Sequence, residues 1–174
     1  MRYERRDILT VPATEGLICH CINSVGAIGG LAAAICKLDQ SAAQHMTPAD
    51  GERLDMGTAI LTTCDTQGIG QQVFAHCVAQ QFPGSPVIDS DCFDSRRKAL
   101  ASALDAADGF WYAQSEGKPV LFLPYNVGCG RAGDKWAAVA DELAALDDSL
   151  ICQMVICVPR WAEASAAANG SIGA

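Results

Sequence analysis

The sequence has few charged residues, few aromatic residues and no long apolar run. Only 18% of its 174 residues are charged and 6% are aromatic, whereas 50% are hydrophobic. This composition excludes a disordered chain and predicts a core built from aliphatic and small side chains. No apolar run reaches the ~18 residues that a membrane-spanning helix needs, so we expect no membrane partner.

Positive charge is also scarce, with 12 Lys and Arg against 20 Asp and Glu and a formal net charge of −8. A surface of that sign argues against binding to a nucleic-acid backbone, because Lys and Arg are needed to replace the phosphate counterions. A small phosphorylated ligand stays compatible with it. Backbone N–H groups and helix N-termini hold phosphate without any net positive charge.

The chain has nine cysteines but no C-x-x-C pair, which is the usual spacing of a structural zinc site. The nearest approach is Cys19-His20-Cys21 with His76-Cys77 further on. Neighbours on a strand point to opposite faces, so these side chains could not all reach one metal ion. The first seven residues, MRYERRD, lack the apolar segment of a secretory signal. We therefore expect reduced thiols, a cytoplasmic location, no metal and no cofactor.

Apolar runs alternate with helix-forming segments along the chain. Five runs read as buried strands: residues 16–23, 56–63, 72–80, 119–125 and 151–158. Three segments favour helices: residues 31–38, 94–107 and 135–146. Residues 2–11 could hold an edge strand. Such alternation predicts an α/β domain with a mostly parallel sheet covered on both faces, over residues 1–160, followed by a C-terminal tail at 161–174.

Two glycine-rich loops each follow a predicted strand and precede a predicted helix. They are residues 24–30 (SVGAIGG) and 126–134 (NVGCGRAGD). Glycine lets a backbone approach a ligand closely, and the next helix offers free N–H groups. Ligands of parallel sheets bind at the carboxyl ends of the strands, where both loops lie. The pair predicts a phosphate-bearing ligand, although each loop alone could be a tight turn. Neither matches a P-loop or a dinucleotide fingerprint.

The first loop region, from His20 through Asn23, Gly26 and Gly29 to Ala32, resembles the first ligand loop of macro domains. The stretch from Gly128 to Trp136 (GCGRAGDKW) resembles their second ligand loop. Residues 7–8 and 56–59 also resemble family positions, so the similarity extends over residues 1–158 in the expected order. The resemblance implies a three-layer α/β/α fold with a mixed, mostly parallel sheet, and ADP-ribose or ADP-ribose 1″-phosphate as the ligand.

The resemblance also implies a role for individual residues. Asp7 would accept a hydrogen bond from the adenine amino group, with Ile8 beside it. Asn23 would bind the distal ribose. The remaining implied ligand contacts come from the two loops: Gly26, Ile28, Gly29, Gly30, Leu31, Val127, Gly128, Cys129, Gly130, Arg131, Ala132 and Gly133.

The sequence departs from the family pattern at several positions. Arg6 stands where the family usually has Gly, and Arg131 stands where Leu is usual. The Arg131 guanidinium could contact a phosphate or face solvent. One hydrolase branch uses a Lys after the strand that 72–80 resembles, and this chain has none there. The Asp of that branch would align with Ala132, two residues before Asp134.

Two classes of function remain open, a hydrolase and a non-catalytic ADP-ribose-binding module. The hydrolase would act on ADP-ribose 1″-phosphate or on ADP-ribosylated protein, and the absence of an appended domain favours it slightly. Its candidate catalytic residues are Asp134, His20 and Asn23. Asp134 could instead cap the following helix, and His20 could be a packed strand residue. A nucleotide-binding α/β domain outside the family is a third, weaker alternative.

Overall fold

We describe the protein from a computed structural model, over residues 1–86, 88–115 and 119–168. The strands are β1 (Arg2–Arg5), β2 (Leu17–Asn23), β3 (Ala59–Thr66), β4 (Gly70–Gln80), β5 (Val120–Pro124) and β6 (Gln153–Val158). The helices are α1 (Gly30–Leu38), α2 (Ser41–Met46), α3 (Phe93–Gln114), α4 (Trp136–Asp147) and α5 (Glu163–Ala168). Three 3₁₀ turns are η1 (Ile8–Thr10), η2 (Asp89–Asp91) and η3 (Arg160–Ala162).

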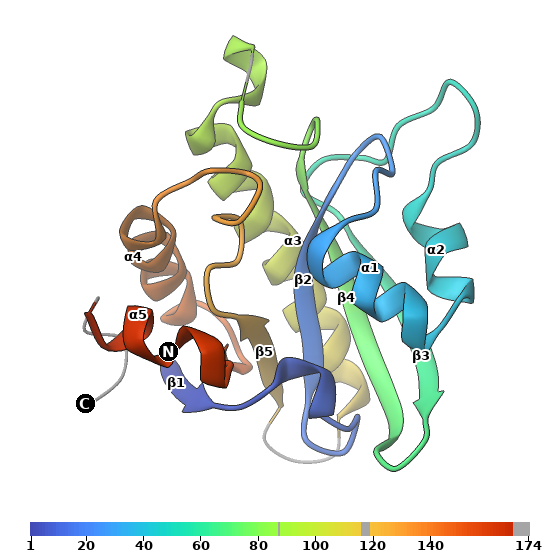
Figure 1. The fold of residues 1–174 in the computed structure, drawn as a ribbon, viewed down its shortest axis with the longest axis vertical. Coiled ribbons are helices and arrows are strands. Elements are labelled where there is room, and N and C mark those ends of the chain that lie inside the picture. The colour runs from blue at the N-terminus through green and yellow to red at the C-terminus, as the bar shows by residue number, and fades with distance from the viewer. Residues whose placement is uncertain (87, 116–118, 169–174) are drawn as a thin grey trace.

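The six described strands form one sheet in the order β1-β6-β5-β2-β4-β3 (Figure 1). All neighbours run parallel except β3, which pairs antiparallel with β4 at one edge. Strand β1 occupies the other edge, beside β6. This arrangement confirms the predicted mixed, mostly parallel sheet. It also brings the carboxyl ends of β2 and β5 together, since these two strands are neighbours.

Helices cover both faces of the sheet, which confirms the three-layer α/β/α prediction (Figure 1). Residues of β2 alternate between the faces as a buried strand requires. Leu17 and Cys19 join the core cluster on the side of α3 and α4, which includes Leu104 and Leu143. Ile18 and Ile22 join a second cluster on the side of α1 and α2, which includes Ile35 and Met46.

Helix α3 extends seven residues beyond the predicted end at residue 107, to Gln114. Trp111 explains the extension, because it is buried in the same cluster as Leu104, two helical turns earlier. The exposed Gly109 does not end the helix, since its position on the outer face needs no side chain for packing.

The segment predicted to be a C-terminal tail is helical where it is described. Residues 160–168 form η3 and α5, and Ala162 and Ala166 are buried in the main core cluster. Small side chains explain the error, because alanines let a helix pack closely without a strong apolar pattern. In Figure 1 this segment lies beside β1, and Glu163 lies 3.9 Å from Arg5. Residues 169–174 of the predicted tail lie outside the described residues.

Candidate functional site

A cleft of about 960 Å³ opens at the carboxyl ends of β2 and β5. Five segments line it: the end of β1 with η1, the first glycine-rich loop, the end of β4 with the turn after it, the second glycine-rich loop, and η3. Twelve of the fifteen predicted ligand residues line this cleft: Asp7, Ile8, Asn23, Ile28, Gly29, Gly30, Leu31, Val127, Gly128, Gly130, Arg131 and Ala132. The topology therefore brings together segments that are more than 100 residues apart in the chain.

The first loop is closed by the Asn23 side chain. Its amide nitrogen donates to the Ala27 carbonyl at 2.7 Å, and its amide oxygen accepts from the Ala27 N–H at 2.9 Å. Helix α1 begins directly after this loop, and its N-cap residue, Gly29, offers no side-chain cap. The first N–H groups of α1 are therefore available to an anionic ligand at the cleft wall.

The second loop is a series of tight turns that follows β5. Asn126 and Gly128 both have positive φ values, 63° and 74°. The loop is closed by hydrogen bonds from the Cys129 N–H to the Asn126 carbonyl and from the Gly133 N–H to the Cys129 carbonyl. A side chain on Gly128 would meet no atom within 4 Å, so the backbone there faces open space.

Three predicted ligand residues, Gly26, Cys129 and Gly133, do not line the cleft. A Cβ on Gly26 would lie 2.6 Å from Pro48, so this glycine permits close packing against the next segment. The Cys129 thiol donates to the Val127 carbonyl at 3.5 Å, and burial raises its pKa to about 12, so it is no ready nucleophile. Gly133 abuts Ser85 rather than the cleft.

His20 lies at the base of the cleft but is only 2% exposed. Its Nε2 is 2.6 Å from Nδ1 of His76, whose Nε2 is 2.7 Å from the Thr62 hydroxyl. Burial, with His76 beside it, holds the pKa of His20 well below its usual range. These contacts favour the interpretation of His20 as a packed strand residue rather than a catalytic residue, because a buried neutral imidazole is a poor proton donor at neutral pH.

Asp134 does not line the cleft. Its carboxylate accepts two hydrogen bonds from Nη1 of Arg97 on α3, at 2.8 and 3.1 Å. Helix α4 begins at Trp136 with Lys135 as the N-cap residue, so the alternative prediction of Asp134 as N-cap is wrong by one position. The geometry does not favour a catalytic role for Asp134, which stays a prediction.

The remaining cleft wall carries Trp161, whose importance the sequence analysis missed. This side chain is 82% exposed, far more than any other large hydrophobic side chain among the described residues. It lies in η3 and lines the cleft together with Asp7, Ile8 and Arg160. Asp7 caps η1 by accepting a hydrogen bond from the Leu9 N–H at 3.0 Å. Trp136, by contrast, is a core residue.

The cleft is richer in positive charge than the chain as a whole. Two carboxylates line it, those of Asp7 and Glu163. Four arginines line it as well: Arg5, Arg6, Arg131 and Arg160. Arg131 and Arg160 form no ion pair with any residue that the structure describes. The excess of cations favours an anionic ligand in a protein whose net charge is −8.

A scan against protein-family models finds no match, and a search of curated proteins finds none either. Solved structures do match. The macrodomain of Mycobacterium tuberculosis DarG is 18% identical, with 91% of this chain and 96% of that chain covered and a TM-score of 0.67. The Oceanobacillus iheyensis macrodomain with ADP is 20% identical, with 90% of this chain and 81% of that chain covered and a TM-score of 0.61. A mutant of the Oceanobacillus iheyensis macrodomain with ADPR is 17% identical, with 88% of this chain and 81% of that chain covered and a TM-score of 0.61.

The class defined by the sheet and its cleft is a three-layer α/β/α domain with a cleft between two loops at the strand ends. The solved structures identify this architecture as the macrodomain fold, as the two loop motifs predicted. Within residues 1–86, 88–115 and 119–168, no helix is long and apolar enough to cross a membrane. The same residues contain no group of three or more His, Cys, Asp or Glu placed to hold a metal ion.

Proposed function

We propose that the chain binds ADP-ribose in this cleft. The observation that carries the proposal is the convergence of two glycine-rich loops, four arginines and one exposed tryptophan on a single cleft. Each feature suits one part of the ligand. Bare backbone and cations suit a diphosphate, and an aromatic face suits an adenine.

The diphosphate would lie between the two loops. Helix α1 begins there with its N-terminal N–H groups uncapped by a side chain. The Arg131 guanidinium from the second loop reaches the first, since its Nη1 is 3.5 Å from the position of a Cβ on Gly29. A phosphate at this point would receive backbone N–H groups and a guanidinium together, which are the strong donors for such an oxyanion.

The adenine would lie at the wall that Asp7, Ile8 and Trp161 form. A tryptophan that is 82% exposed leaves a large apolar face in water, which is unusual unless a partner covers it. Stacking on a base would cover that face, and Asp7 offers a carboxylate to an exocyclic amine. The structures titled with ADP and ADPR belong to proteins with the same fold, and support this choice of ligand.

Binding without catalysis is the function that the geometry supports best. The carboxylates of the cleft are Asp7, directly before η1, and Glu163, directly after η3. His20 is buried and neutral, and both groups of the Asn23 amide contact Ala27. Hydrolysis of ADP-ribose 1″-phosphate or of ADP-ribosylated protein, with Asp134, His20 and Asn23 as catalytic residues, therefore stays a prediction from the sequence alone.

Calorimetric titration with ADP-ribose tests the proposal directly. Trp161→Ala should weaken binding by about 1–3 kcal/mol, the usual value of one base stacked on an aromatic ring. Trp161→Phe should retain most of the affinity. Tyr112→Ala is the matched control, because Tyr112 is an exposed aromatic residue on α3 that does not line the cleft.

Absence of binding by the wild-type protein would refute the proposed function. Equal binding by Trp161→Ala and wild type would remove Trp161 from the site. Incubation with ADP-ribose 1″-phosphate and with an ADP-ribosylated peptide then separates a binding module from a hydrolase. Release of phosphate or of free ADP-ribose would establish catalysis.

A further inference from the structure

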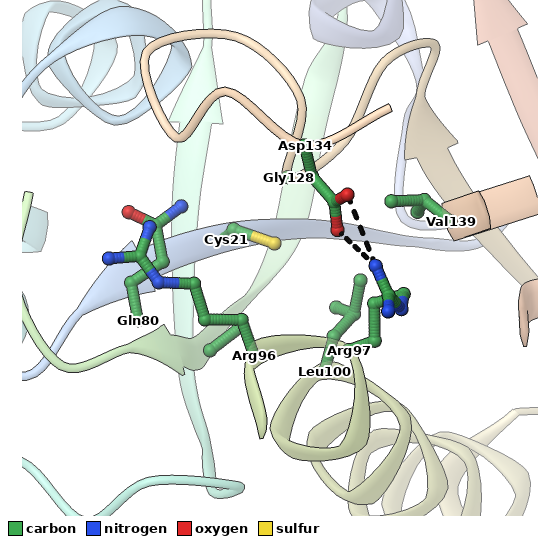
Figure 2. Close-up of a pocket in the computed structure, with 9 residues that line it drawn as sticks. Cys21, Gln80, Arg96, Arg97, Leu100, Gly128, Asp134 and Val139 are labelled. Carbon is green, nitrogen blue, oxygen red and sulfur yellow. Dashed lines mark hydrogen bonds and ion pairs between the residues drawn. The ribbon is translucent and has the colours of Figure 1, made fainter. Parts of the chain in front are cut away.

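An ion pair joins the end of the second glycine-rich loop to α3. Figure 2 shows Arg97 of α3 and Asp134 of the loop pointing toward each other. Both carboxylate oxygens of Asp134 accept from the same nitrogen, Arg97 Nη1, at 3.1 and 2.8 Å. The Asp134 side chain is 7% exposed and that of Arg97 is 20% exposed. The pair is therefore largely withdrawn from solvent, where screening by salt is weak.

Neither partner of this pair reaches the cleft. Arg97 and Asp134 line a small pocket behind the loop, with Val139 of α4 and Leu100 of α3. Three residues line both this pocket and the cleft: Cys21, Gln80 and Gly128. Gly128 belongs to the second loop, so the position of this loop offers a route by which Arg97 can affect a ligand in the cleft.

The two ends of the loop are held differently. At its start the Tyr125 N–H donates to the Cys157 carbonyl of β6 at 2.9 Å, so the sheet fixes this end. At its far end the Asp134 carboxylate accepts from Arg97 and from the Lys135 N–H at 2.7 Å. The Lys135 contact is to the adjacent residue and cannot locate the loop relative to the rest of the fold. The Arg97 contact can, because α3 packs on the sheet through residues such as Leu100 and Leu104.

We propose that Arg97 is a positioning residue for ligand binding, which holds Asp134 and thereby keeps the second loop in the shape that forms the cleft wall. This inference rests on the proposed function and assigns Asp134 to the loop anchor rather than to chemistry. Without the guanidinium, a carboxylate with little access to solvent would lose its cationic partner. Movement of the loop toward water would let solvent reach this unpaired carboxylate. The same movement would displace the backbone from Val127 to Ala132.

Four variants and one matched control test the inference by ADP-ribose titration and thermal unfolding. Arg97→Met and Asp134→Asn should each weaken binding about tenfold, and the double variant should be no worse, because either change breaks the same contact. Arg97→Lys should recover most of the affinity, since one nitrogen makes both hydrogen bonds in the structure. Lys98→Met is the control. Lys98 pairs with Asp94 at 2.8 Å on the same helix, and both side chains are well exposed, so this variant should leave affinity unchanged.

Amide hydrogen exchange of the ligand-free protein provides a readout that does not depend on the ligand. Arg97→Met should raise exchange at residues 127–134 and leave the first loop unchanged. Unchanged affinity and unchanged exchange in Arg97→Met would overturn the inference. Loss of binding in Asp134→Asn but not in Arg97→Met would also overturn it, and would return Asp134 to direct ligand contact. If wild type fails to bind ADP-ribose, the proposed function fails, and the exchange comparison alone decides on the anchor.

Discussion

The first loop, residues 24–30, is held by hydrogen bonds between neutral groups, whereas the second, residues 126–134, is joined at its far end to α3 by an ion pair. The Asn23 amide forms two hydrogen bonds with the Ala27 backbone, and the Ser24 hydroxyl donates to the Gln81 carbonyl at 2.8 Å. In the second loop the turns are made by backbone contacts, and an ion pair joins the far end to α3. Two loops of similar composition are thus held by hydrogen bonds between neutral groups in one case and by backbone turns with an ion pair in the other.

The glycines should reveal this contrast most strongly. Gly26 has φ +72°, and a Cβ there would lie 2.6 Å from Pro48 and 2.9 Å from the Thr47 backbone. Gly26→Ala should therefore lower the free energy of unfolding by about 2–5 kcal/mol, from strain and overlap together. Gly128→Ala, at φ +74° but in open space, should cost about 1–2 kcal/mol. Urea unfolding of the two variants measures the difference, and equal costs would contradict it.

Acid should act on the first-loop side of the molecule, where His20 and His76 lie on β2 and β4. Burial first, then the nearby His45, lowers the pKa of His76 from 6.5 to about 4, while Asp39 opposes the shift. The unfolded chain therefore takes up the proton first. The free energy of unfolding should be highest above pH 6.5 and fall by about 3 kcal/mol as the pH drops to about 4.

Denaturant titrations between pH 7 and pH 4.5 test this dependence, because most carboxylates titrate below that window. His76→Gln should reduce the slope of the profile, because it removes one of two buried histidines and leaves His20, whose pKa burial also lowers. A profile of the same slope in wild type and His76→Gln would show that another group carries the dependence.

The smallest of these effects concerns Asn23, whose amide closes the first loop by two hydrogen bonds to Ala27. Asn23→Ala should weaken ADP-ribose binding by about 1–3 kcal/mol, since the Ala27 N–H and carbonyl both lose a partner. Asn23→Asp keeps the acceptor but not the donor, so its affinity for ADP-ribose should lie between those of wild type and Asn23→Ala. Calorimetry of the three proteins gives the order of their affinities. Unchanged affinity in Asn23→Ala would separate closure of the loop from ligand binding.

The buried strands and both loops could be predicted because their signals are local. An apolar run such as that of β2, followed by several glycines, specifies a buried strand and a close turn within a few residues. The contacts that the prediction missed are non-local. Nothing near Asp134 in sequence indicates Arg97, and the pairing of His20 with His76 requires the register of β2 on β4, which places the two residues opposite each other.

Trp161 escaped prediction for a different reason. It lies among alanines that carry no strong apolar pattern, and a tryptophan in a sequence is usually expected to contribute to a core. The structure instead buries Ala162 and Ala166 and leaves Trp161 in solvent at the cleft. Exposure of a large side chain is a property of the packed fold, so the sequence pattern could not report it.

The sheet order has a consequence for synthesis on the ribosome. Strand β1 pairs with β6, so the first strand of the sheet has no described strand partner until the last has been made. The inner strands β2, β4 and β5 can associate earlier, with both glycine-rich loops already translated. The cleft wall with Asp7 and Trp161 can form only when β6 and η3 emerge, so a nascent chain completes this wall late in its synthesis.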